Sequence, residues 1–247
     1  ETSNFTYDRS DLKLAQLAGW VSVIGDCTLD QSKAWIQELR MDKELQNHLN
    51  ELTSKSESLI TADLNMGYGR RIGWYALIRA LKPRLVVETG VDKGLGSCVI
   101  TSALLRNKVE GHPGQYLGTD INTNAGWLFQ DPYRQMGEIL YGDSIESLSN
   151  LEGPINLFIN DSDHSADYEE KEYNCITNKL APGAVILGDN SHVTNKLYEF
   201  ALSSDRQFLF FSEKPADHWY PGAGIGAAWK VDHSRLKTAS QTETVVF

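Results

Sequence analysis

Acidic and amide side chains follow two apolar stretches of this chain, and their types suit a divalent cation. Asp161 comes shortly after the apolar run 155–159, while Asp189 and Asn190 follow the run 184–187. If both runs are parallel strands, their carboxyl ends lie at the sheet edge where open α/β sheets bind ligands. Two carboxylates and an amide oxygen suit a hard ion such as Mg²⁺. We therefore predict a Mg²⁺ site there, although the same carboxylates can also serve loop hydrogen bonds or an amine without any metal.

A glycine-rich turn follows an earlier apolar run, Leu85–Val87. Gly90, Gly94 and Gly96 allow the backbone to turn tightly and to approach a ligand closely, with the start of a helix behind them. A dinucleotide fingerprint requires a third glycine where this chain has Val99. The turn thus favours a nucleotide-type cofactor other than NAD.

Two later strand ends carry groups that can bind the same cofactor. Asp120 ends the run 115–119, and its carboxylate can accept hydrogen bonds from both hydroxyls of a ribose. Asp143 and Ser144 follow the next run, where helix capping explains them nearly as well as ligand contact. We expect these residues at the same sheet edge as the glycine turn.

An alternating order of strands and helices is needed to bring these residues together. Short apolar runs recur through the chain between helix-compatible segments such as 74–81 and 97–106, which predicts a mostly parallel, doubly wound α/β sheet. The last two runs, 207–211 and 225–231, have no helix between them. We therefore expect an antiparallel hairpin at the edge of a seven-stranded sheet.

The first part of the chain has a different character. Residues 1–66 are polar, with apolar positions such as Leu14, Leu17 and Val21 at helical spacing. We interpret 1–66 as an N-terminal helical extension and 67–247 as the cofactor-binding domain, together one compact unit. Such helices can cover a sheet edge or a dimer surface, or roof a substrate pocket, and the sequence leaves these alternatives open.

The order of the motifs resembles that of class I S-adenosylmethionine (SAM) dependent methyltransferases, which have a Rossmann-like fold. Residues 88–96 resemble their first motif, and Asp161 with Asp189-Asn190 is similar to the Mg²⁺ ligands of the catechol-type O-methyltransferases. Residues 161–165 also resemble the Asp-Gly-Asp-His-Ser signature of a bacterial methyltransferase group, with Ser162 in place of glycine.

The resemblance implies SAM as the cofactor. Glu88 would orient it, and residues 68–71 resemble the segment that closes over its methionine end, although Arg70 and Arg71 can equally be solvated residues at a helix start. The residues assigned to SAM on this basis are Tyr68, Arg70, Glu88, Gly90, Gly94, Gly96, Ser97, Asp120, Ile121, Asp143, Ser144 and Asp161.

Methyl transfer to a hydroxyl needs an oriented, deprotonated acceptor. A metal ion can supply both, while a nearby base takes the proton. His164 is the first candidate for this base and His192 the second, because imidazole titrates near neutral pH. The aromatic and polar loop 214–222 suits a substrate wall. The implied acceptor is a small hydroxylated molecule such as a diol, a sugar or another natural product.

Three other functions stay open at this point. They are a metal-independent methyltransferase, a SAM-binding protein without activity, and a nicotinamide oxidoreductase. The composition narrows the partners, because a formal net charge of -10 argues against a nucleic-acid backbone. Three cysteines without a CxxC pair, no apolar run of roughly 20 residues and no signal-peptide pattern favour a cytoplasmic protein without a membrane span. The length permits a homodimer but does not require one.

Overall fold

The apolar runs of the chain form the seven strands of one sheet, in the order β3-β2-β1-β4-β5-β7-β6. This computed structural model describes residues 7–57 and 67–231. The strands are β1 (Leu85–Thr89), β2 (Gln115–Asp120), β3 (Gly137–Tyr141), β4 (Ile155–Asn160), β5 (Leu180–Asp189), β6 (Gln207–Ser212) and β7 (Gly224–Trp229). The first five strands pair in parallel, and β7 pairs antiparallel with both β5 and β6. The predicted doubly wound sheet with an antiparallel edge hairpin is confirmed.

The strand order reverses between β1 and β4, which pair directly through Thr89 and Asn160 at their carboxyl ends. Helices leave these two strands toward opposite faces, so a crevice opens between the loops that follow them. Successive strand-end loops are joined by backbone hydrogen bonds, from Gly90 N–H to Thr119 O and from Asp161 N–H to Thr89 O, both 2.9 Å. The sheet therefore brings the loops after β1, β2 and β4 together at one edge.

The fifth strand begins earlier than the sequence indicates. The expected strand 184–187 is the core of β5, but β5 starts at Leu180, which pairs with Ile155. The register shifts before Leu157 pairs with Val185, and this irregularity accommodates Pro182, which has no N–H to donate. Residues 180–183, which precede the apolar run, are thus part of the strand.

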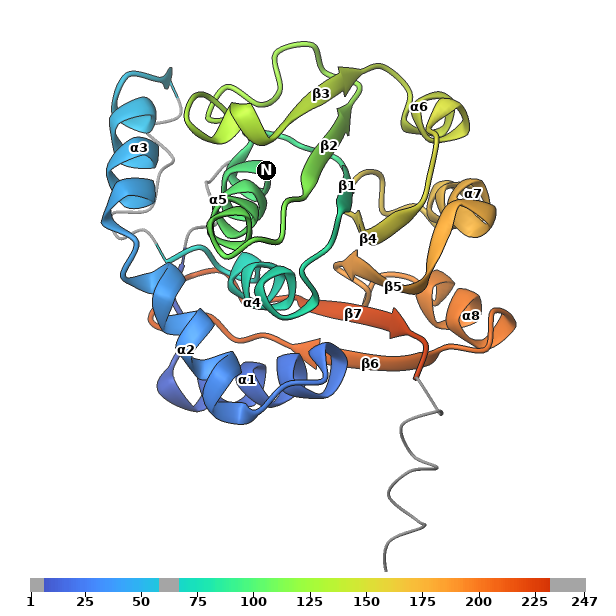
Figure 1. Cartoon of the computed structure of the whole chain (residues 1–247), viewed down its shortest axis with the longest axis horizontal. Coiled ribbons are helices and arrows are strands. Elements are labelled where there is room, and N and C mark those ends of the chain that lie inside the picture. The colour runs from blue at the N-terminus through green and yellow to red at the C-terminus, as the bar shows by residue number, and fades with distance from the viewer. Residues whose placement is uncertain (1–6, 58–66, 232–247) are drawn as a thin grey trace, which may run out of the picture.

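Helices cover both faces of the sheet (Figure 1). One face carries α1 (Asp11–Gly25), α2 (Leu29–Arg40), α3 (Lys43–Ser54), α4 (Arg71–Leu81) and α5 (Leu95–Val109), and the other carries α6 (Ser144–Asn150), α7 (Ala166–Ile176) and α8 (Lys196–Ser203). Each face has its own hydrophobic cluster. Short 3-10 turns lie at Tyr133–Met136 and Thr177–Lys179.

The N-terminal helices pack onto the sheet and its helices. Leu17 and Val21 of α1 are fully buried, and the Trp20 indole N–H donates to the Leu209 carbonyl of β6 at 3.3 Å. The helices α1 to α3 share one hydrophobic cluster with α4 and α5. Of the alternatives for this segment, the structure shows helices that cover a face of the sheet near its β6 edge. The remaining predicted residues of the extension, 1–6 and 58–66, lie outside the described residues.

Candidate active site

A cavity of about 570 Å³ lies at the carboxyl ends of the parallel strands. Eight residues predicted from the sequence line it: Arg70, Gly90, Asp120, Ile121, Asp143, Ser144, Asp161 and His164. The other eight lining residues were not among the predicted site residues: Arg71, Asp92, Thr119, Asn122, Gly142, Ser162, Asp163 and Tyr168. A larger groove of about 1020 Å³ lies at the opposite edge of the sheet, where none of the predicted site residues is found. The cavity at the strand ends is therefore the candidate site.

The turn after β1 requires glycine for two reasons: a positive φ and the close approach of a neighbouring loop. Gly90 has φ +82, and a Cβ added there would lie 2.0 Å from the carbonyl oxygen of Asp161. Gly94, with φ +92, is the residue before the first turn of α5. A side chain at Gly90 would push apart the loops after β1 and β4, which form the floor of the crevice.

Other residues of this motif lie behind the turn. Glu88 is 1% exposed and accepts hydrogen bonds from Tyr116 (2.5 Å) and Ser97 (3.2 Å). Burial raises the pKa of Glu88 to about 7, although these two hydroxyl donors and Arg71 oppose the rise. A Cβ at position 96 would collide with the Glu88 carboxylate, which explains the glycine there. Glu88 and Ser97 thus form a buried hydrogen bond behind the turn instead of lining the cavity.

Tyr68 and Gly94 also lie outside the cavity lining. The Tyr68 side chain is fully buried in the cluster formed with the N-terminal helices, although its neighbour Arg70 reaches the cavity. Tyr68 has a left-handed backbone conformation, with φ 64, so the side chains on either side of this turn point in different directions. Sequence proximity within the Tyr-Gly-Arg-Arg segment therefore did not predict a shared location.

Asp120 and Asp143 line the other end of the cavity. The two carboxylate oxygens of Asp120 accept backbone N–H groups of Asp92 and Asn122, both at 2.8 Å. Asp143 caps α6 by accepting the Ile145 N–H at 2.7 Å. Asp143 therefore caps the helix, as one of the two interpretations expected. It can still accept a hydrogen bond from a ligand in the cavity, because each carboxylate oxygen has two acceptor sites.

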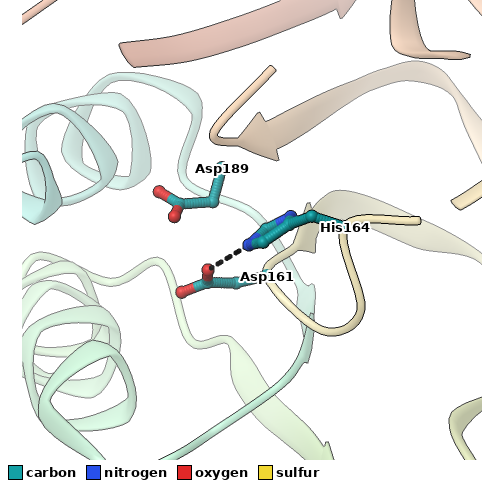
Figure 2. A group of neighbouring side chains, drawn as sticks. All are labelled: Asp161, His164 and Asp189. Atoms are coloured by element: carbon teal, nitrogen blue, oxygen red, sulfur yellow. Dashed lines mark ion pairs between the residues drawn. The ribbon is translucent and has the colours of Figure 1, made fainter. Parts of the chain in front are cut away.

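Asp161, His164 and Asp189 come together from the ends of β4 and β5 (Figure 2). One ligand atom from each lies within 4.8 Å of the others, and His164 Nε2 is 3.8 Å from Asp161 Oδ1. Burial and the neighbouring Asp189 raise the pKa of Asp161 well above its ordinary value. The structure thus brings together two of the three predicted metal ligands and the first candidate base.

Asn190 lies next to the acidic cluster, whereas His192 does not. The Asn190 amide nitrogen is 3.1 Å from His164 Nε2, so this residue borders the cluster. His192 is exposed, and its ring lies 6.4 Å from that of Phe210. On the other side of His164, Nδ1 is 3.6 Å from Glu169, which raises the pKa of His164. The cluster therefore includes His164 and not His192.

Two arginines contact the acidic pair. The Nε–H group of Arg70 donates to Asp189 Oδ1, and Arg71 Nη2 lies 3.8 Å from Asp161 Oδ2. The side chain of Arg70 is 3% exposed and that of Asp189 is fully buried. Burial opposes ionisation of Asp189, but the Arg70 charge prevails and lowers the pKa of Asp189. This pairing joins positions far apart in the chain, so no local pattern indicated it.

The N-terminal segment and the loop between β6 and β7 continue this charge network. Arg70 is 3.8 Å from Glu213, which also pairs with Arg9 at 2.5 Å and accepts the Tyr7 hydroxyl at 2.5 Å. The Tyr7 ring lies 5.4 Å from the ring of Tyr220 in the loop predicted to wall the substrate. The loop is therefore held beside the acidic cluster through Glu213.

Comparison with known proteins agrees with this geometry. Residues 87–191, which span β1 to the end of β5, match the family described as methyltransferase domain. The part of the chain from β1 to the end of β5 is therefore similar to a methyltransferase domain. Within the described residues, no helix has the length and apolarity needed to cross a bilayer. No curated protein matches the sequence.

Solved structures share the fold at low sequence identity. An O-methyltransferase from Bacillus cereus in complex with S-adenosylhomocysteine (SAH) is 14% identical over 74% of this chain and 91% of that one, with a TM-score of 0.59. The O-methyltransferase TomG from Streptomyces achromogenes, involved in tomaymycin synthesis and in complex with SAM, is 16% identical over 76% and 89%, with a TM-score of 0.58. An SAH-bound methyltransferase from Podospora anserina is 14% identical over 77% and 89%, with a TM-score of 0.56.

Proposed function

We propose that this protein is a SAM-dependent methyltransferase that transfers the methyl group of SAM to a hydroxyl oxygen of a small organic molecule. The observation that carries this proposal is the cluster of Asp161, His164 and the buried Asp189. Asp161 and His164 line the cavity, and Asp120 lines its other end. A methyl donor bound along the cavity would have its reactive end beside the cluster. The names of the Bacillus and Streptomyces structures, both O-methyltransferases, support oxygen as the acceptor atom.

The lining residues support an assignment of the parts of SAM to parts of the cavity. Asp120 would accept the ribose hydroxyls, using acceptor sites left beside its two backbone bonds. Ile121, which is 79% exposed at the same strand end, offers an apolar surface for the adenine ring, with Ser144 on the neighbouring loop. Arg71, which is largely buried and has an unpartnered Nε, would bind the methionine carboxylate.

The acidic cluster fits a divalent cation. Asp189 Oδ2 is buried without a hydrogen-bond partner, while Oδ1 is held by Arg70. Asp161 and Asp189 would hold the ion with the Asn190 side chain, and oxygen ligands of this kind suit Mg²⁺. When bound, the ion would lower the pKa of a coordinated acceptor hydroxyl.

His164 would take the proton of the acceptor. Its Nε2 faces Asp161 and Asn190, and Glu169 lies beside Nδ1. A carboxylate on one ring nitrogen fixes the tautomer and orientation of an imidazole, so that the other nitrogen is the acceptor. A positioned base of this type contributes about 10²- to 10⁴-fold to the rate.

The two arginines favour a second mechanism, in which no metal is used. Arg70 bonds Asp189, and Arg71 lies near Asp161, so two cations already accompany the two carboxylates. In this case the acidic pair would orient the acceptor through hydrogen bonds, and His164 would remain the base. Dependence on added metal separates the two mechanisms.

The experiment combines SAM with a panel of hydroxylated acceptors, in Mg²⁺ or in EDTA, and follows SAH formation. We expect turnover that EDTA abolishes, a loss of about 10²-fold or more in His164→Ala, and unchanged SAH affinity in Asp189→Asn. His192→Ala serves as the matched control, because that ring is exposed and lies away from the cluster. Full activity in EDTA would establish the metal-independent mechanism, and SAM binding without turnover of any acceptor would contradict the proposed activity.

A further inference from the structure

A buried carboxylate on α7 lies directly behind the cavity lining. Glu172 is fully buried, and none of the described residues forms an ion pair with it. Its Oε1 accepts hydrogen bonds from Ser162 (2.8 Å) and Ser144, and its Oε2 accepts from Thr89 (2.9 Å) and Asn160. Four neutral donors from outside the helix therefore surround one carboxylate group.

These four donors belong to three different strand ends. Thr89 is the last residue of β1 and precedes the glycine turn, while Ser144 starts α6 after β3. Asn160 is the last residue of β4, and Ser162 follows Asp161 in the loop after it. The three segments are far apart in the chain, and all of them border the cavity at their next residues or line it themselves. Glu172 is thus a common anchor for three walls of the site.

The energetics of this anchor point to a role beyond stabilising α7. A buried ionised carboxylate costs several kcal/mol unless its oxygens are fully hydrogen-bonded, and an apolar side chain at such a position is often at least as stable. Burial raises the pKa of Glu172, and the hydroxyl and amide donors oppose this rise. What an apolar residue cannot provide is a fixed, directional link between three loops.

Ser162 strengthens the same network. This residue stands where the related bacterial signature has glycine, and its hydroxyl is one of the four donors to Glu172. A glycine at this position would leave Oε1 with Ser144 alone. The departure from the signature is therefore explained by a hydrogen bond that ties the Asp161 loop to α7.

We propose that Glu172 is a positioning residue for the cofactor, which sets the relative positions of the loops after β1, β3 and β4. The inference rests on the proposed binding of SAM in this cavity. Glu172 itself does not line the cavity, so it acts through the loops that carry Gly90, Ser144 and Asp161. Loss of the anchor lets these loops move independently and weakens cofactor binding even where the protein stays folded.

The test measures SAH affinity by titration calorimetry at a temperature well below the melting transition, where a change of global stability alone leaves Kd unchanged. We expect Glu172→Gln to raise Kd about 10-fold, because an amide offers one acceptor oxygen in place of two. Thr89→Val keeps the side-chain shape, removes one donor and does not touch the cavity lining, so we expect about a 5-fold rise. Glu170→Gln, on the same helix but half-exposed and paired with Lys196, is the control and should stay within about twofold.

Each outcome decides a different question. Folded Glu172→Gln and Thr89→Val proteins that bind SAH with the Kd of the unaltered protein would overturn the positioning role. If Glu172→Gln does not fold, Thr89→Val decides alone by the same criterion. If the unaltered protein fails to bind SAH, the proposed cofactor site is wrong, and the inference fails with it for that separate reason.

Discussion

The buried carboxyl group of Glu88 should make the stability of the protein depend on pH. Its carboxyl group is 1% exposed, and burial raises its pKa from 4.5 to about 7. The folded protein therefore holds this proton more tightly than the unfolded chain does. The stability that the protonated group contributes is complete below pH 4.5 and is lost as pH rises through about 7.

The magnitude follows from the difference between the two pKa values. At about 1.4 kcal/mol for each pH unit, ionising Glu88 in the folded protein costs about 3 kcal/mol relative to the unfolded chain. Roughly 2.5 kcal/mol of this cost develops between pH 5 and pH 8. Glu88→Gln removes the titration while keeping an oxygen that accepts from Tyr116 and Ser97. The free energy of unfolding of the variant, relative to the unaltered protein, should therefore rise by about 2.5 kcal/mol over this range.

Urea denaturation of the ligand-free proteins at several pH values between 5 and 8 measures this difference directly. A chain of this size should show it also as a relative shift of about 5–10 °C in melting temperature. Glu146→Gln, at an exposed position on α6, is the matched control and should run parallel to the unaltered protein. Equal pH dependence of Glu88→Gln and the unaltered protein would refute the argument, because it would mean that Glu88 titrates alike in the folded and unfolded states.

Two further predictions concern backbone fit and buried charge. Gly90→Ala should lower the free energy of unfolding by about 3 kcal/mol or more, because its Cβ would meet the Asp161 carbonyl. Gly111→Ala is the control, since Gly111 has a similar φ but open space around it, and it should cost about 1 kcal/mol in urea denaturation. Equal losses in the two variants would contradict the close approach at Gly90. Arg70→Met should cost about 3–5 kcal/mol by leaving the buried Asp189 carboxylate unpaired, and Arg70→Lys should recover part of this loss in the same assay. A neutral Arg70→Met variant would show that Asp189 is not ionised beside it.

Local patterns in the sequence were sufficient for the architecture. The apolar runs and the helical segments between them predicted the parallel strands and the edge hairpin, because burial on both faces requires continuous apolar runs. They also placed Asp161 and Asp189 at one edge, since parallel strands end on the same side. Boundaries were less accurate where tertiary pairing decided them, as at Leu180, whose pairing with Ile155 extends β5.

Within the site, the sequence determined which segments meet, and the tertiary structure decided which side chains face one another. The Gly90 turn and the Asp120 strand end follow from order along the chain, because each comes directly after a strand of the parallel sheet. The pairing of Arg70 with Asp189 and the four bonds to Glu172 join residues far apart in sequence. The tertiary structure likewise places His164, and not His192, beside Asp161. Side-chain direction in a loop depends on the packing of other segments around it, and no period or spacing in the sequence records that packing.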